Sequence, residues 1–299
     1  MNIFAVVVTY NRLSLLKKTL SSLKSQTLTI NTILVVNNGS TDGTKEWLNS
    51  QTEIYVINQE NLGGSGGFWR GIKEAYELGA DYIWCMDDDV YPYDNCLSNL
   101  ISAMPAEGGI AAPQRYYNGK ELVFGGECKH FNFTNPFKKL KSDIKSDDLI
   151  KTSNLISVES ISFEGPLFSR EVVEKIGFPE KGLFIFWDDT EYSYRAFKFG
   201  FKVFYATKAR LYKVDLRSDE HGRQKRSWKY PYMIRNEVYF VVKYGGLFYR
   251  LIYVFLLFFK YLIGIVINVI RHSGKYSIND VKIVCRSVMD GINGNLIIY

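Results

Sequence analysis

The stretch EIYVINQENLGGSGGFWRGIKEAYELGADYIWCMDDD, residues Glu53 to Asp89, decides the fold. It begins with an apolar run that is typical of a buried strand, and Gly66–Gly79 follows with the apolar spacing of a helix. A second apolar run, Asp81–Met86, leads directly into three aspartates. Strand, helix and strand in this order predict a right-handed crossover between parallel strands.

The same alternation extends towards the amino end of the chain. Ile3–Thr9 and Thr32–Asn37 have the composition of buried strands, and Ser14–Gln26 carries leucines at helical spacing. These segments predict an α/β fold with a mostly parallel, doubly wound sheet. A polar motif follows each of the four strands, and ligands of such sheets bind at the carboxyl edge that these motifs share. The sequence therefore predicts one site built from four separate segments.

Composition narrows the class of protein without identifying it. The chain has 299 residues, 46% hydrophobic residues and a net charge of +6, which is a globular composition with a mildly basic balance. Such a balance fits a membrane surface or a phosphate-bearing ligand. The four cysteines have no metal or redox spacing, and no signal peptide is visible, so we expect a cytosolic amino end that is part of the fold.

The carboxyl-terminal part of the sequence changes character. Residues 138–154 are charged and weakly patterned, which predicts a surface loop or flap, whereas Leu251–Ile270 is nearly all apolar. The apolar run is long enough to span a bilayer, but Lys260 at its middle would cost about 2.5–3.5 kcal/mol there. We therefore expect a helix that lies in the membrane interface, with a membrane span and a plain buried helix as alternatives.

The three aspartates predict a metal site. Asp87 and Asp89 alternate along the chain and can point to the same side of an extended segment. Their hard oxygen ligands suit Mg²⁺ or Mn²⁺, which typically keep a diphosphate as a further ligand. The alternative is a strand end with turn-capping carboxylates, although three in a row exceed what capping needs.

The glycine-rich segment NLGGSGGFWRG, Asn61 to Gly71, predicts close approach of the backbone to an anion at a helix start. Arg70 would add a fixed charge for phosphate. The segment is not a dinucleotide fingerprint, because Trp69 stands where the third glycine would be. The alternative is a flexible turn before a helix.

A second acidic group lies in WDDTEYSYR, Trp187 to Arg195. Asp188 and Glu191 have the spacing of a capping box, which leaves Asp189 without that role. A spare carboxylate beside a bound substrate is a natural general base for a hydroxyl. At helical spacing Arg195 shares a face with Asp188 and Glu191, so we expect it to hold the acids in place.

The order of VVVTYNR, VVNNGSTDGT, NLGGSGGFWRG, DDD, EGPLFSRE and WDDTEYSYRA resembles glycosyltransferase family 2, inverting enzymes with the GT-A fold. The resemblance covers roughly Met1 to Ala209, and the motifs are specific as a set. NLGGSGGFWRG with MDDDV and FWDDTEY is most similar to the bacterial galactofuranosyltransferases, and rhamnosyltransferases share much of the pattern.

The resemblance implies a role for each motif. The residues implied in nucleotide-sugar binding are Thr9, Tyr10, Asn11, Arg12, Asn38, Asn61, Gly63, Gly64, Arg70 and Asp88. Those implied in holding Mn²⁺ or Mg²⁺ are Asp87 and Asp89, and those near the acceptor are Glu164, Trp187 and Asp188. Asp189 would be the catalytic base. The family often has aspartate where Asn38 stands.

One departure from the family pattern concerns the metal. The family usually has a metal-binding histidine after the strand near Leu211, where this chain has Lys213. His221 could supply a ligand from a loop instead, or Lys213 could contact the diphosphate directly.

The resemblance implies an inverting, metal-dependent transferase that moves galactofuranose from UDP-galactofuranose to a hydroxyl, and the apolar carboxyl-terminal run leads us to expect a lipid-linked bacterial surface polysaccharide intermediate as acceptor. We expect a GT-A domain over residues 1–235, with halves 1–110 and 111–235, and a helical, membrane-associating region over 236–299. The expected location is the cytoplasmic face of the membrane, peripheral or monotopic, with no nucleic-acid partner; oligomerisation stays open. The alternatives are a rhamnosyltransferase using dTDP-rhamnose, a nucleotidyltransferase, and a non-catalytic membrane scaffold.

Overall fold

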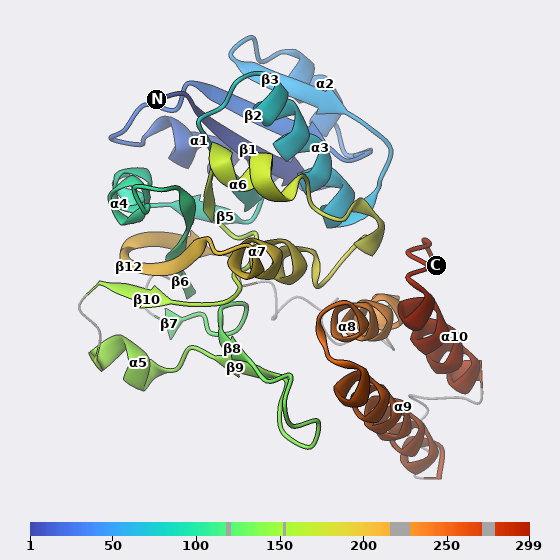
Figure 1. Cartoon of the computed structure of the whole chain (residues 1–299). Helices are drawn as coiled ribbons and strands as arrows, with labels where there is room; N and C mark the ends of the chain where they lie inside the picture. The colour runs from blue at the N-terminus through green and yellow to red at the C-terminus, as the bar shows by residue number, and fades with distance from the viewer. Residues whose placement is uncertain (118–120, 152–153, 216–227, 271–278) are drawn as a thin grey trace. The chain divides into compact units, whose positions relative to one another are not determined.

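The computed structural model describes residues 1–117, 121–151, 154–215, 228–270 and 279–299 (Figure 1). The chain divides into two compact units that interleave along the sequence. Unit 1 comprises Met1–His130, Asp143–Lys181 and Asp188–Asp215, and unit 2 comprises Phe131–Ser142, Gly182–Trp187 and Leu216–Tyr299. The boundary expected after residue 235 stays a prediction.

Strands and helices alternate through most of unit 1. The strands are β1 (Ile3–Thr9), β2 (Thr32–Asn37), β3 (Ile54–Asn58), β4 (Tyr82–Asp87), β5 (Val90–Pro92), β6 (Gly109–Tyr117), β7 (Glu121–Leu122), β8 (Cys128–Phe131), β9 (Lys141–Asp143), β10 (Leu155–Ser157), β11 (Leu167–Ser169) and β12 (Lys202–Lys213). The helices are α1 (Leu13–Lys24), α2 (Thr44–Asn49), α3 (Gly63–Glu77), α4 (Cys96–Ala103), α5 (Ser146–Lys151), α6 (Arg170–Ile176), the 3₁₀ turn η1 (Lys181–Leu183), α7 (Asp188–Lys198), α8 (Tyr230–Tyr244), α9 (Leu247–Ile270) and α10 (Asn279–Asn293). The segment predicted as a loop at 138–154 thus contains β9 and α5.

The main sheet is mixed, with strand order β10-β12-β6-β11-β4-β1-β2-β3. The prediction of parallel strands is confirmed for β4, β1, β2 and β3 and for the pair β6 and β12. It is wrong for β11, which runs antiparallel to both β4 and β6, and for β10 and β5, which run antiparallel to β12. Parallel neighbours in a sheet need a crossover connection, which is usually a helix. β11 instead follows a turn at Gly165, whose amide donates to the carbonyl of Cys85 in β4, so β11 can run antiparallel to β4.

Each face of the sheet carries its own hydrophobic core. Along β1, Phe4, Val6 and Val8 pack in one cluster with residues of α3, α6 and α7. The alternate residues Ile3, Ala5 and Val7 pack in the other cluster with residues of α1 and α4. This period of two, with both faces covered, explains why the strands read as continuous apolar runs.

The glycines of α3 set its distance from β1. A methyl group added at Gly67 would come within 2.5 Å of Val8, and one at Gly71 within 2.3 Å of Val6. α3 begins at Gly63, three residues before the predicted start, so much of the glycine-rich segment is helix and not loop. Two of its glycines therefore serve helix–sheet packing.

Unit 2 is largely helical, and α9 is its most apolar element. By length and composition Leu247–Ile267 could cross a membrane, with a mean hydropathy of 2.1 and only 17% of the most apolar window buried. Nine of its large apolar side chains are exposed at spacings of one to four residues: Leu247, Phe248, Leu251, Phe255, Phe259, Ile263, Val266, Ile267 and Ile270. One apolar face of α9 thus lies open along its length.

Candidate functional site

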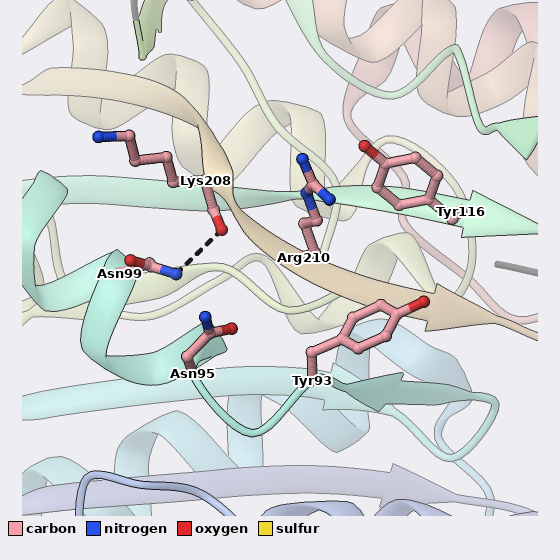
Figure 2. A pocket seen from close by; sticks show the side chains of 6 residues that line it. All are labelled: Tyr93, Asn95, Asn99, Tyr116, Lys208 and Arg210. Atoms are coloured by element: carbon pink, nitrogen blue, oxygen red, sulfur yellow. Dashed lines mark hydrogen bonds between the residues drawn. The ribbon is translucent and has the colours of Figure 1, made fainter. Parts of the chain in front are cut away.

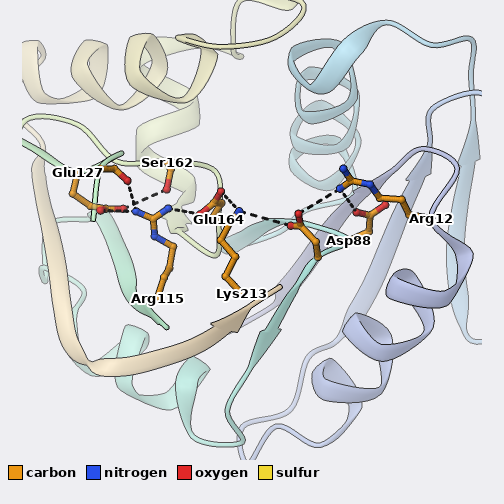
Figure 3. Close-up of polar contacts among 9 residues, drawn as sticks. Arg12, Asp88, Arg115, Glu127, Ser162, Glu164 and Lys213 are labelled. Atoms are coloured by element: carbon orange, nitrogen blue, oxygen red, sulfur yellow. Dashed lines mark hydrogen bonds and ion pairs between the residues drawn. The ribbon is translucent and has the colours of Figure 1, made fainter. Parts of the chain in front are cut away.

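The end of β4 meets the end of β1 through the acidic cluster Asp87–Asp89. The hydroxyl of Thr9 donates to Asp88 Oδ2 at 2.7 Å, and Arg12 Nη1 lies 3.2 Å from Asp88 Oδ1 and 3.4 Å from Asp89 Oδ2 (Figure 3). The motifs after the first and fourth strands therefore share one site, because β1 and β4 are parallel neighbours whose carboxyl ends coincide.

Burial dominates the electrostatics of this cluster. It raises the pKa of Asp88 to about 6, against the opposing effect of Arg12 and of the Thr9 hydrogen bond. It also raises the pKa of Asp87 well above its usual range, and the charge of Asp89 raises it further. The charge of Asp89 thus disfavours the charge of Asp87, so a cation beside the two carboxylates would lower the pKa of Asp87.

A chain of ion pairs crosses unit 1 from this cluster to β6 (Figure 3). Lys213 Nζ lies 3.9 Å from Asp89 Oδ1 and pairs with Glu164. Glu164 also pairs with Arg115, whose Nη2 is 2.7 Å from Glu127 Oε2. Burial alone would raise the pKa of Glu164, but the charges of Arg115 and Lys213 outweigh it and lower the pKa to about 2.

The network changes what Lys213 and Glu164 are expected to do. Glu164, implied near the acceptor, is here a counter-ion shared by Arg115 and Lys213. Lys213, considered as a diphosphate contact, already has two carboxylate neighbours, Glu164 and Asp89. His221, the alternative metal ligand, lies outside the described residues.

The cluster offers two ligands for a metal. Within the described residues no three His, Cys, Asp or Glu side chains are arranged to hold an ion. However, Asp89 Oδ1 is a buried oxygen that has no hydrogen-bond partner among those residues, and Asp87 is its acidic neighbour. Mg²⁺ and similar ions are commonly held by one or two carboxylates together with substrate phosphates and water. Asp87 and Asp89 fit that arrangement.

The motif after β2 organises the loop that leads into α3. Asn38 is buried, and its amide donates to Gly63 O at 2.9 Å and to Asn61 Oδ1 at 3.2 Å. Its Oδ1 accepts from Gln59 Nε2 at 2.8 Å. Because the Asn38 side chain is occupied in this way, its direct effect here is to shape the start of α3.

The remaining residues implied in nucleotide binding lie around the same edge. Asn11 has a positive φ of 53° and accepts a hydrogen bond from the Thr41 amide at 2.6 Å, which joins the loops after β1 and β2. Tyr10 is 46% exposed and could cover a bound ligand. Arg70 pairs with Glu74 one turn along α3 at 3.1 Å, and a methyl group at Gly64 would meet nothing within 4 Å.

A second acidic pair opens α7. Asp188 is buried, and burial followed by the charge of Asp189 raises the pKa of Asp188 to about 7. The hydroxyl of Ser65 lies beside Asp188 and partly offsets the rise, although its Oγ has no hydrogen bond of ideal geometry among the described residues. Since Ser65 is in the first turn of α3, which follows β3, this contact places Asp188 at the same sheet edge as Asp87–Asp89.

Arg195 and Trp187, two neighbours of this pair, make further contacts. Arg195 pairs with Glu191 at 3.1 Å, as its spacing predicts, and donates to the carbonyls of Ile176 and Phe178 at 2.7 and 2.9 Å. It therefore ties α7 to the end of α6 as well. In unit 2, Trp187 packs against Phe240 with ring centroids 5.0 Å apart, and Lys141 Nζ lies 4.2 Å from its ring centroid.

Sequence analysis missed Arg115 and Glu127. Both are buried, and Arg115 carries the link between Glu127 and Glu164. Neither belongs to a local motif, and their pairing joins residues 12 and 49 positions apart. A charged residue that follows the apolar run at the start of β6 is a signal that could have pointed to Arg115.

A separate polar pocket of about 500 Å³ opens on unit 1 (Figure 2). It is lined by Tyr93, Asn95, Asn99, Tyr116, Lys208 and Arg210. No residue of the predicted site lines it, so it takes no part in the chemistry considered below.

Comparison with known sequences gives a family match. The family model described as glycosyl transferase family 2 matches residues 4–177. The galactofuranosyltransferase GlfT1 of Mycolicibacterium smegmatis is 30% identical over 210 residues, which is 66% of this chain and 65% of that protein. The O-antigen chain rhamnosyltransferase RfbN of Salmonella typhimurium is 26% identical over 217 residues, 70% of this chain and 65% of that protein. The chain thus spans just under two thirds of the length of these relatives.

Comparison with solved structures supports the fold. GalNAc-T7, solved with UDP, GalNAc and Mn²⁺, superposes with a TM-score of 0.60 at 15% identity over 81% of this chain and 47% of that one. The mannosyltransferase PcManGT of Pyrobaculum calidifontis, solved with GDP-Man and Mn²⁺, gives 0.53 at 14% identity over 81% and 63%. These neighbours confirm the predicted GT-A fold, with the mixed sheet described above. Because the family model covers more than half of its length, this chain belongs to glycosyl transferase family 2.

Proposed function

We propose that this chain is an inverting glycosyltransferase that moves galactofuranose from UDP-galactofuranose to a hydroxyl of a lipid-linked glycan, with Mn²⁺ or Mg²⁺ as cofactor. The observation that carries the proposal is the buried Asp89 Oδ1 beside Asp87, which has no hydrogen-bond partner among the described residues and lies at the sheet edge that also holds Asp188. The galactofuranosyltransferase relatives support the donor, and the Mn²⁺ in two structural neighbours supports the cofactor.

The residues at the ends of β1 and β4 have different roles in the proposed reaction. Asp87 and Asp89 would hold the ion, which when bound neutralises charge on the departing nucleoside diphosphate. Thr9 and Arg12 hold Asp88 and Asp89 in place through the contacts at 2.7–3.4 Å. Arg12 keeps 43% of its side chain exposed and could turn its remaining nitrogens to the diphosphate.

Asp189 would act as the general base. It is adjacent to Asp188, whose raised pKa of about 7 keeps a proton on that group close to neutrality. In its ionised form Asp189 would take the proton of the acceptor hydroxyl as that oxygen attacks the anomeric carbon. The bond to the diphosphate breaks on the opposite face, so the configuration inverts without a covalent enzyme intermediate.

The membrane part of the proposal rests on α9. Its exposed apolar face would lie in the interface at the cytoplasmic side of the membrane, where a lipid-linked acceptor is presented. Flotation of the full chain with vesicles containing anionic lipid tests this. Replacement of Leu251 and Phe255 by aspartate should abolish flotation, whereas an aspartate pair at Leu78 and Tyr55, exposed in unit 1, should not.

A donor screen tests the proposed reaction. UDP-galactofuranose should support transfer to a lipid-linked acceptor, and UDP-galactopyranose, UDP-glucose and dTDP-rhamnose should not, with activity lost when Mn²⁺ is removed. Transfer from dTDP-rhamnose alone would favour the second candidate, which the rhamnosyltransferase relatives support, and would leave the reaction class intact. Release of pyrophosphate in place of a nucleoside diphosphate would overturn the reaction class.

A further inference from the structure

The segment of unit 2 that leads into α7 has an unusual backbone. Phe184, Phe186 and Trp187 have φ values of 65°, 66° and 67°, in the left-handed region that favours glycine. Three bulky residues in that region within four positions cost of the order of 1–3 kcal/mol each. Such a conformation persists only where surrounding groups hold it.

Asn236 of α8 supplies the first holding contact. Its side chain is fully buried, and Nδ2 lies 2.9 Å from the carbonyl oxygens of Leu183, Ile185 and Phe186. An amide has two hydrogens for these three acceptors, so at least one hydrogen is shared. The three carbonyls converge on one nitrogen because the left-handed residues turn the backbone between them.

Arg235, the preceding residue, completes the arrangement. It is also fully buried; its Nη2 donates to the carbonyls of Gly182 and Leu183 at 3.0 and 2.9 Å, and its Nε donates to Asn236 Oδ1 at 2.8 Å. It makes no ion pair within the described part of the chain. Its Nη1 also donates to the Ile297 carbonyl, and its guanidinium carbon lies 5.1 and 5.5 Å from the ring centroids of Tyr232 and Tyr299. A buried guanidinium without an ion pair is weak evidence for stability, so we assign it the role of fixing one conformation.

We infer that Arg235 and Asn236 are positioning residues for the reaction, which fix the Gly182–Trp187 segment and through it the start of α7. Trp187, the predicted acceptor contact, belongs to the held segment, and Asp188 and Asp189 follow it directly. A change in the backbone at Phe186 or Trp187 would rotate the first turn of α7 and displace the Asp189 carboxylate. This inference rests on the proposed role of Asp189 as base.

Asn236→Leu tests the inference, because leucine keeps the approximate size of the side chain and removes its donors. Since an error of about 1 Å in a reacting group can cost about 10²-fold, we expect kcat to fall about 100-fold. The KM for donor and the calorimetric Kd for UDP should change less than about threefold, because the residues that Asn236 contacts, Leu183, Ile185 and Phe186, are not among those implied in nucleotide binding. Val238→Ala is the matched control: it removes buried volume from the same helix, and kcat should stay near normal.

A rescue experiment separates positioning from general stability. Phe186 is 41% exposed, so its side chain can be removed with little loss of packing. Combined with Asn236→Leu, Phe186→Gly should restore kcat at least tenfold because glycine adopts positive φ without strain, whereas Phe186→Ala should not. Chymotrypsin cleavage after Phe184, Phe186 or Trp187 should be faster in Asn236→Leu than in wild type and should slow in the glycine double variant.

Arg235→Lys gives a second route if Asn236→Leu folds poorly. It keeps the charge but loses the planar pair of donors, and we expect kcat to fall at least tenfold with an unchanged Kd for UDP. Normal kcat in both variants, an equal loss in Val238→Ala, or equal effects of glycine and alanine at position 186 would overturn the inference. Failure of the proposed function looks different: wild type would not transfer sugar, or Asp189→Asn would transfer normally.

Discussion

The aspartates that follow β4 and those that open α7 lie at the same sheet edge, yet they are surrounded differently. Asp88 and Asp89 face Arg12, and Asp89 also faces Lys213, so cations offset much of their burial. Asp188 faces Asp189 and the neutral Ser65, and its pKa rises to about 7. Burial raises the pKa of Asp88 as well, to about 6, so the clusters differ mainly in their neighbours. Arg12 and Lys213 beside the first cluster suit it to a diphosphate that is bound with a metal ion, and the adjacent carboxylates of the second suit it to proton transfer.

Asp189→Asn should have the largest effect, because it removes the group to which we assign proton transfer. A positioned general base typically contributes 10²–10⁴-fold, so we expect kcat to fall by about that factor while UDP binding, measured by calorimetry, is retained. Asp188→Asn is the matched control and should lose much less. Near-normal turnover in Asp189→Asn would remove the distinction between the two clusters.

Asp89→Asn should act on the metal and leave the base intact. Loss of an outer partner of a metal ligand typically costs 10–100-fold in affinity, and loss of a ligand should raise the Mn²⁺ concentration for half-maximal activity by at least about as much. Excess Mn²⁺ should restore part of the activity, whereas it should not rescue Asp189→Asn. An unchanged Mn²⁺ titration would show that Asp89 is a structural partner of Arg12 alone.

Asp188→Asn should change how stability depends on pH. The folded pKa of Asp188 is about 7 and its ordinary value is 3.8, so between these values the folded state keeps a proton that the unfolded state has lost. The wild-type unfolding free energy therefore falls as pH rises through this window, by about 1.4 kcal/mol per pH unit for one proton. The difference between variant and wild type in urea unfolding should show this slope from pH 4 to 7. A flat difference curve would contradict the assigned pKa.

Ser65→Ala should have the smallest effect of the four. The Ser65 hydroxyl lowers the pKa of Asp188, so its removal should raise that pKa and extend the same window upwards by a fraction of a pH unit. The measurement is the midpoint of the Asp188 titration in the side-chain carboxyl region of a ¹³C NMR spectrum. A downward shift would mean that Ser65 does not act on the ionised form of Asp188.

The sequence predicts well those parts of the molecule that depend on residues close together along the chain. The strands β1 to β4, their parallel order and the gathering of Thr9, Arg12 and Asp88 follow from apolar runs with polar ends. The Glu164–Lys213 pair could not be predicted, because 49 positions separate its members and each alone resembles a ligand contact. The contacts of Asn236 with the segment before α7 likewise join residues 50 to 53 positions apart.

The close packing of α3 against β1 limits which residues of the proposed donor-binding site can be mutated. Gly67 and Gly71 leave no room for a methyl group, so a mutational library that randomises them would mostly yield displaced helices and unfolded chains. At Gly64 the added carbon meets nothing within 4 Å, and its φ is not in the left-handed range. A library confined to Gly64 and its exposed neighbours would therefore vary the ligand-facing end of the helix while the sheet contact that orients it stays fixed.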